Sequence, residues 1–90
     1  MIYVSYDPFQ INGGSIYRME DGQVIDHICD IDSTIGTLAR AVTKYAYSTN
    51  DFDINFKTEF PHDMQEFKNA IDYYELNTFH NNKLTVKEIK

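Results

Sequence analysis

The sequence predicts one α/β domain in which a mixed five-stranded sheet packs against two helices. Short segments with alternating apolar and polar residues indicate strands, and two longer segments with apolar residues at helical spacing indicate helices. Their order is strand, strand, strand, helix, strand, helix, strand. Helices between consecutive strands supply the long crossovers that parallel strands need. With 90 residues, the chain has the size of a single domain over residues 1–90.

Three strands are predicted in the first third of the chain. Residues 2–6 alternate as IYVSY, which is typical of a strand with one buried face, and the following Asp-Pro pair ends the pattern. Residues 15–20 and 24–31 follow as two more strands. The residues between them include an Asp-Gly pair, which tolerates the positive φ angles of a type I′ turn. We therefore expect an antiparallel hairpin here.

A first helix is predicted over residues 33–48, with Asp32 or Ser33 as its N-cap. Its apolar side chains recur at helical spacing and should face the sheet. They are Ile35, Leu38, Ala39, Val42, Tyr45 and Ala46. Residues 54–59 alternate again and predict the fourth strand.

A second helix is predicted to begin at Pro61, which suits a first helical turn, and to end near Leu76. Its expected buried face consists of Met64, Phe67, Ala70, Ile71 and Tyr74. A polar loop over residues 77–82 follows. Leu84 and Val86 then indicate a short last strand.

Composition narrows the class of protein. The formal charge is −6, with 14 acidic against 8 basic residues, which opposes nonspecific attraction to nucleic acids and anionic membranes. The single cysteine, Cys29, excludes an internal disulfide. The start of the chain has neither a basic segment nor a long apolar run, so we expect no signal peptide, no membrane span and a cytoplasmic location. Abundant Ile, Asn, Tyr, Phe and Lys beside two arginines are typical of AT-rich genomes, such as those of low-GC bacteria and their phages.

Two acidic residues stand where predicted strands end. Asp7 follows YVSY at residues 3–6, and Glu59 closes INFKT at residues 54–58. With the order of elements, these two segments resemble the ribonuclease H-like fold, in which the first strand lies beside the fourth. The resemblance implies a trimmed version of that fold. It also implies that Asp7 and Glu59 correspond to two carboxylates that hold Mg²⁺ or Mn²⁺ for phosphodiester cleavage.

The resemblance is incomplete at the family's third carboxylate, which lies in the first helix. Residues 33–48 contain no Asp or Glu, so Asp32 would have to take that place. Asp7 also has a structural interpretation as a turn residue before a proline, and Glu59 has one as a solvated residue near a helix start. On the structural interpretation the protein needs no cofactor.

His27 and Cys29 form a second candidate pair. Two residues apart on a strand, they should project from the same face. They could then bind a transition metal, or the imidazole could activate the thiol. Two ligands do not complete a zinc site. The alternative is a half-buried pair in which the cysteine acts as a small apolar residue.

Acidic and tyrosine side chains suggest a surface for a partner. Acidic residues gather near the predicted third and fourth strands at Asp26, Asp30, Asp32, Asp51 and Asp53. Tyrosine, which is favoured at interfaces, is more abundant than a small core requires. The relevant positions are Tyr17, Tyr45, Tyr47, Tyr73 and Tyr74.

These features predict a noncatalytic intracellular protein that binds a protein partner or itself. The candidate partner-binding residues are Asp26, Asp30, Asp32, Tyr17, Tyr47 and Tyr73. One alternative is a metal-dependent nuclease that uses Asp7, Glu59 and Asp32. The other is an acidic inhibitor or antitoxin that imitates nucleic acid.

Overall fold

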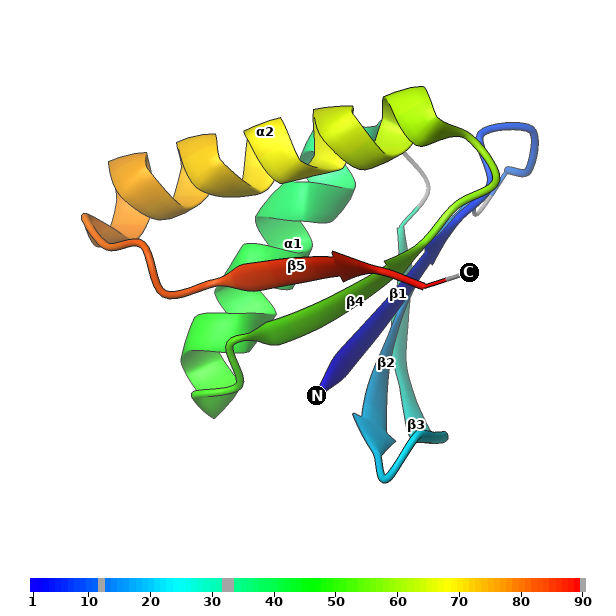
Figure 1. The fold of residues 1–90 in the computed structure, drawn as a ribbon, viewed down its shortest axis with the longest axis horizontal. Coiled ribbons are helices and arrows are strands. Elements are labelled where there is room, and N and C mark those ends of the chain that lie inside the picture. Colours follow the sequence, from blue (N-terminus) through cyan, green and yellow to red (C-terminus); the bar gives the residue numbers. More distant parts are fainter. Residues whose placement is uncertain (12, 32–33, 90) are drawn as a thin grey trace.

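The computed structural model describes residues 1–11, 13–31 and 34–89. It contains five strands and two helices in the predicted order (Figure 1). The elements are β1 (Ile2–Tyr6), β2 (Gly14–Glu20), β3 (Gln23–Ile31), α1 (Ile35–Thr49), β4 (Asp53–Lys57), α2 (Pro61–Phe79) and β5 (Thr85–Glu88). The predicted fold class, with its mixed sheet and two helices, is confirmed.

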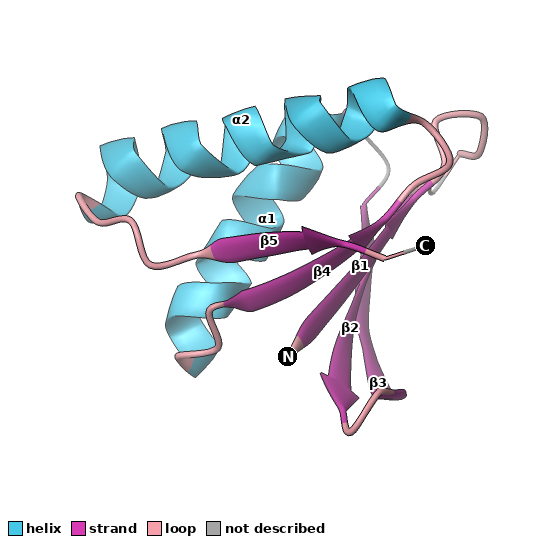
Figure 2. Cartoon of the chain, viewed as in Figure 1, coloured by secondary structure: helices cyan, strands magenta, loops and turns pink. Residues whose placement is uncertain are grey.

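The strands form one sheet in the order β3-β2-β1-β4-β5 (Figure 2). β1 is antiparallel to β2, and β2 to β3, whereas β4 runs parallel to both β1 and β5. The expected neighbourhood of the first and fourth strands is present, with Ile2 opposite Ile54 and Val4 opposite Phe56. Because β1 and β4 are parallel, their carboxyl ends reach the same edge of the sheet.

Both helices cover one face of the sheet, and they also pack against each other (Figure 1). The alternation of the strands explains this arrangement, because one set of side chains is apolar and fully buried. That set includes Ile2, Val4, Ile16, Ile54 and Phe56, which join Leu38, Val42, Phe67 and Ile71 of the helices in a single core. The opposite face carries the other set, such as Tyr3, Tyr17 and Asn55.

The helix boundaries differ from the prediction in two places. The N-cap of α1 is Thr34, whose hydroxyl accepts from the Thr37 amide at 3.5 Å, whereas the predicted caps lie outside the described residues. α2 continues to Phe79, about one turn beyond the predicted end, so the first residues of the predicted polar loop are helical. The Asn77 side-chain amide donates to the carbonyl of Tyr73 at 2.7 Å within that turn.

The β2–β3 hairpin has the predicted turn, but the pairing of its two strands is irregular at two positions. Asp21 and Gly22 have φ angles of 52° and 78°, as a type I′ turn requires. Further along, the pairing shifts twice, so that Ile25 and Ile28 lie opposite no residue of β2. Each shift is a β-bulge, and an extra residue in one strand reverses which face the following side chains occupy.

The bulge at Ile28 separates the predicted pair His27 and Cys29. His27 lies opposite Tyr17, whereas Cys29 lies opposite the buried Ile16, so the two project from opposite faces. Their expected common face is therefore wrong. Cys29 packs partly buried against the core, and burial together with Asp30 raises the pKa of its thiol.

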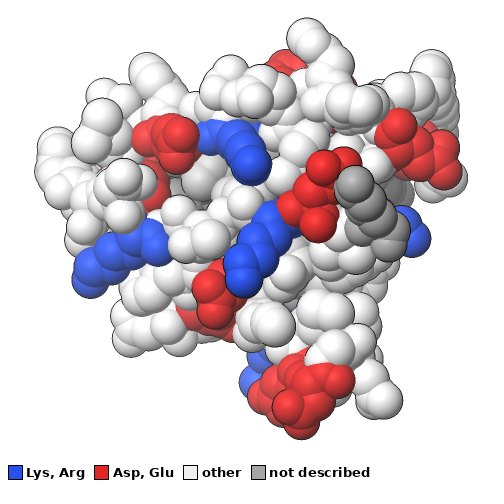
Figure 3. All heavy atoms as spheres, in the orientation of Figure 1, with Lys and Arg blue, Asp and Glu red and all other residues white. Residues whose placement is uncertain are grey.

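Charged side chains are spread over the surface. In the view of Figure 3, acidic atoms gather over the β2–β3 hairpin at the bottom, and elsewhere acidic and basic atoms are interspersed. Among the residues that the structure describes, no helix combines the length and the apolar content needed to cross a membrane.

Candidate functional site

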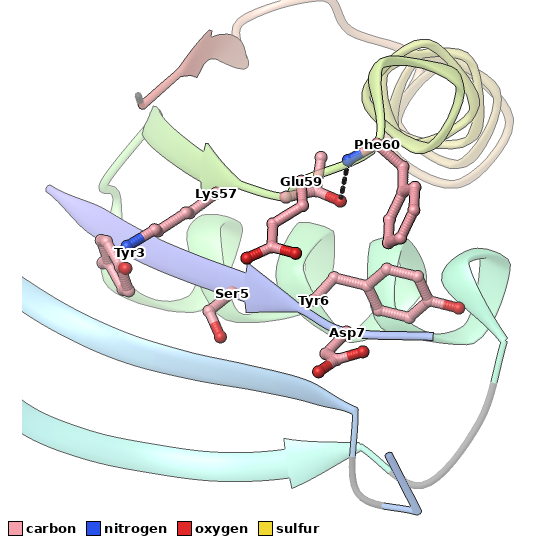
Figure 4. Close-up of a pocket in the computed structure, with 8 residues that line it drawn as sticks. Tyr3, Ser5, Tyr6, Asp7, Lys57, Glu59 and Phe60 are labelled. Atoms are coloured by element: carbon pink, nitrogen blue, oxygen red, sulfur yellow. Dashed lines mark hydrogen bonds between the residues drawn. The ribbon is translucent and has the colours of Figure 1, made fainter. Parts of the chain in front are cut away.

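A hollow of about 200 Å³ opens at the carboxyl ends of β1 and β4 (Figure 4). Its lining residues are Tyr3, Ser5, Tyr6, Asp7, Lys57, Thr58, Glu59 and Phe60. The first four belong to β1 and the residue after it, and the last four to the end of β4 and the segment that leads into α2. Both acids that the sequence singled out, Asp7 and Glu59, therefore line the same hollow.

The parallel pairing of the two strands explains why these acids meet. Ser5 and Lys57 are register partners on β1 and β4. Asp7 and Glu59 each follow two residues later, just beyond the ends of these neighbouring strands. Figure 4 shows the two carboxylates on the same side of the strands, near the Ser5 hydroxyl. Glu59 is exposed, and Asp7 is half-buried.

Asp7 also organises the turn that follows β1. Its carboxylate oxygen Oδ1 accepts from the Phe9 amide at 3.0 Å. Its own N–H donates to the carbonyl of Gly13 at 2.8 Å. Glycine is required at position 13, because a Cβ there would lie 2.1 Å from the Asp7 carbonyl oxygen. The turn role predicted for Asp7 is thus present alongside its place in the hollow.

The electrostatic environment around the hollow is mainly acidic. Burial raises the pKa of the Tyr6 hydroxyl, and the Asp63 and Glu66 carboxylates in the first turns of α2 raise it further. These two acids therefore act on the same side chain that lines the hollow beside Asp7. Lys57 supplies a positive charge, but its amine lies beside the Tyr3 ring in Figure 4, away from Asp7.

Phe60 lines the hollow, and Phe9 contacts it from the turn after β1. We call these two residues, together with Ile11 of the same turn, the apolar rim. Phe9 and Ile11 are each 83% exposed in the turn that Asp7 organises, and Phe60 is 37% exposed. The Phe9 and Phe60 rings meet edge to face, with centroids 5.6 Å apart. Exposed apolar side chains that gather beside a hollow are typical of interaction sites.

As ligands for a divalent cation, the lining residues offer two carboxylates, Asp7 and Glu59. Among the described residues, no three His, Cys, Asp or Glu side chains are placed to hold one ion together. The third candidate, Asp32, lies outside the described residues, and α1 contains no acid in its sequence. The arrangement can accept hydrogen bonds from a cationic group, because two carboxylates and the hydroxyls of Tyr3 and Ser5 face one space.

The predicted partner-binding residues do not share one surface. Asp26 pairs with Arg18 at 2.8 Å on the face of β3 that Cys29 occupies. Asp30 lies on the opposite face, where it accepts from the Ser15 hydroxyl at 2.7 Å and contacts His27 Nε2 at 2.8 Å. These two contacts lower the pKa of Asp30, and the hydrogen bond from the Ser15 hydroxyl has the larger effect.

Of the remaining predicted surface residues, Tyr17 shares the uncovered sheet face with Asp30 and contacts His27, and the others lie elsewhere. Asp51 and Asp53 lie at the start of β4. This start is at the opposite end of the sheet, along the strand direction, from the end of β3 that carries Asp30. Tyr17 lies on the uncovered sheet face, Tyr47 stacks on Phe79 at 3.9 Å, and Tyr73 is exposed on α2. In the part of the chain that is described, these residues form no continuous acidic and tyrosine-rich surface.

A buried acid on α2 escaped the sequence prediction. Glu75 is fully buried, and its Oε2 accepts from the Tyr47 hydroxyl and from the amides of Lys83 and Leu84, at 2.6 and 3.0 Å. Its Oε1 is buried without a hydrogen-bond partner among the described residues. The sequence did carry an indication that Glu75 is buried, because position 75 continues the apolar stripe of Phe67 and Ile71 at helical spacing.

No protein family, no characterised protein and no solved structure shows a significant match to this chain.

Proposed function

We propose that this protein is a noncatalytic, cytoplasmic interaction domain that binds a protein partner, or a second copy of itself, at the hollow and its apolar rim. The observation that carries the proposal is the 83% exposure of Phe9, whose ring contacts Phe60 at a hollow lined by Asp7 and Glu59, and the equal exposure of Ile11 in the same turn. Burying one such side chain in a complex contributes roughly 1.5–3 kcal/mol. A few large side chains at the centre of an interface commonly supply most of its binding energy.

Contacts with neighbouring residues hold Phe9 of the apolar rim in place. Asp7 fixes the turn through the Phe9 amide, and the Phe9 ring contacts Phe60 at the start of α2. A site ordered before binding loses less conformational entropy when its partner arrives. The hollow beside the rim supplies polar groups that can orient a partner. Protein interfaces commonly combine an apolar centre with such polar groups.

Serine substitutions at Phe9 and Ile11 together test the proposal. Both side chains are exposed, so the double variant should fold with an unchanged melting temperature. The matched control is Leu76→Ser, which removes a side chain that is 61% exposed. Leu76 lies roughly 22 Å along α2 from Pro61, at a rise of about 1.5 Å per residue.

The measurement is quantitative affinity capture from cells that make the protein. We expect at least one protein, or a second copy of the chain, to be retained by the wild type and by Leu76→Ser but lost from the Phe9→Ser, Ile11→Ser variant. If every captured protein is retained equally by all three, the rim is not the binding surface and the proposal fails.

The second candidate is a metal-dependent nuclease related to the ribonuclease H-like fold. It is supported by the strand order β3-β2-β1-β4-β5 and by the shared hollow of Asp7 and Glu59. An ion held there would polarise a phosphodiester, with Asp7 and Glu59 as its ligands. Asp7 already holds the Phe9 amide with one oxygen, and α1 offers no third carboxylate, so we rank this candidate second.

Thermal unfolding in excess Mn²⁺ separates the two candidates. Binding to the native state must raise the melting temperature, and Asp7→Asn should abolish that rise if Asp7 is a ligand. Our proposal predicts no rise in either protein. A rise that is lost in Asp7→Asn, together with Mn²⁺-dependent cleavage of a nucleic acid, would establish the nuclease instead.

A further inference from the structure

We infer that the partner presents a basic side chain, Lys or Arg, next to an apolar one. Its cation enters the hollow between Asp7 and Glu59, and its apolar neighbour covers the rim at Phe9. The inference rests on the proposed function and adds the chemistry of the partner to it.

The carboxylates of the hollow are available for such a cation. Among the described residues, the ion pairs join Arg18 with Asp26, His27 with Asp30, and the N-terminal amine with Asp51. Asp7 and Glu59 take part in none of them. Lys57 is the cationic residue of the lining, and Figure 4 places its amine beside Tyr3 rather than against Asp7.

The surroundings add further negative charge. Asp63 and Glu66 lie close enough to Tyr6 to raise the pKa of its hydroxyl, and Tyr6 lines the hollow. The whole chain carries a formal charge of −6. Complementary charge speeds the encounter of two proteins and selects among partners, so a basic segment is favoured over an acidic one.

The same charges argue against a second copy of this chain as the occupant. Two copies that met through this surface would bring Asp7 and Glu59 of each toward the acids of the other. Like charges that face each other across an interface cost free energy. A small inorganic cation would satisfy the carboxylates but would leave Phe9 and Ile11 exposed. A basic residue with an apolar neighbour satisfies both parts of the site.

Two synthetic peptides test the inference. The first is acetyl-Leu-Phe-Arg-Leu-amide, and the second replaces its arginine by citrulline, which is nearly the same size but uncharged. Each is titrated into the ¹⁵N-labelled protein up to millimolar concentration while the amide resonances are followed. We expect the arginine peptide to shift the resonances of residues 5–7 and 57–60. The citrulline peptide should bind roughly tenfold more weakly, because charge-assisted hydrogen bonds are lost.

The double variant Asp7→Asn, Glu59→Gln is the matched control. Asparagine keeps an oxygen for the Phe9 amide, so the turn after β1 should remain. The variant should bind both peptides equally weakly. No shifts in the hollow with the arginine peptide, or equal binding of the two peptides to the wild type, would overturn the inference.

These outcomes are distinct from a failure of the proposed function. Equal binding of both peptides that is lost in the Phe9→Ser, Ile11→Ser variant would leave the rim as a binding surface and remove only the requirement for a basic residue. Shifts by the arginine peptide elsewhere on the protein would count against both.

Discussion

The hydroxyl of Tyr47 on α1 donates a hydrogen bond to the buried carboxylate of Glu75 on α2. The same carboxylate oxygen accepts from the amides of Lys83 and Leu84, just before β5. One side chain thus joins both helices to the segment that leads into the last strand. This contact explains how β5, with only four residues, keeps its place at the edge of the sheet.

Glu75→Ala should lower the free energy of unfolding by roughly 3 kcal/mol, because it leaves the Tyr47 hydroxyl, the buried Leu84 amide and the partly buried Lys83 amide without an acceptor. Urea unfolding followed by circular dichroism measures the change. Glu66→Ala, at an exposed position of the same helix, is the control and should change stability by less than about 0.5 kcal/mol. A loss at Glu75 as small as that of the control would show that the buried carboxylate does not hold the helices to β5.

Tyr47 should be a late-titrating tyrosine. Burial, first, and the hydrogen bond to Glu75 raise its pKa from 10.0 to about 12. A raised pKa means that the folded state favours the protonated phenol. This contribution to stability is complete below pH 10, the unfolded pKa, and is lost as the pH rises through about 12.

The absorbance of tyrosinate during an alkaline titration measures this pKa. Tyr47→Phe should remove a tyrosine that ionises near pH 12 and should make stability less sensitive to pH above 10. Tyr6→Phe is a useful comparison, because the pKa of Tyr6 is raised as well, by a different set of neighbours. An unchanged upper end of the titration in Tyr47→Phe would contradict the assignment.

Cys29 should react slowly with dithionitrobenzoate at neutral pH. Its thiol is partly buried, and burial together with the neighbouring Asp30 raises its pKa, which lowers the fraction of reactive thiolate. Asp30→Asn should accelerate the reaction modestly, because it removes the negative charge but not the burial. Rapid labelling of the wild type would contradict this expectation and would revive an activated thiol on β3.

Gly13→Ala should disturb the turn that carries the apolar rim. The added Cβ would lie 2.1 Å from the Asp7 carbonyl oxygen, so the backbone must move. We expect a loss of roughly 2 kcal/mol in the free energy of unfolding, as for other forced overpacking. Gly36→Ala in α1 is the contrasting variant, because its Cβ would have space and alanine favours a helix by roughly 1 kcal/mol. Equal stability of the two variants would show that Gly13 is not constrained by Asp7.

Much of this fold could be predicted because its signals are local or follow from topology. The hairpin turn at Asp21 and Gly22 depends on adjacent residues that tolerate positive φ angles. The meeting of Asp7 and Glu59 in one hollow follows from two parallel neighbouring strands, which the order of elements already favours. In both cases, the deciding information lies in residue types and in the succession of elements.

Other features depended on contacts that no local pattern encodes. The bulges at Ile25 and Ile28 involve β-branched residues that fit a regular strand equally well, so the separation of His27 from Cys29 could not be foreseen. Glu75 is an acid at a position that continues a buried stripe, and its burial depends on partners distant in the sequence, Tyr47 and the amides of Lys83 and Leu84. The role proposed for Phe9 depends on its exposure, which a sequence pattern does not report.

Site-specific photo-crosslinking inside cells that make the protein tests most directly whether the hollow and its apolar rim bind a partner. Benzoylphenylalanine would replace Phe9 of the apolar rim in one variant and Leu76 of α2, which is also exposed, in the other. We expect a discrete crosslinked protein from position 9 and none from position 76. Equal crosslinking from both positions, or crosslinking from position 76 alone, would contradict the assignment of the hollow and its rim as the binding site.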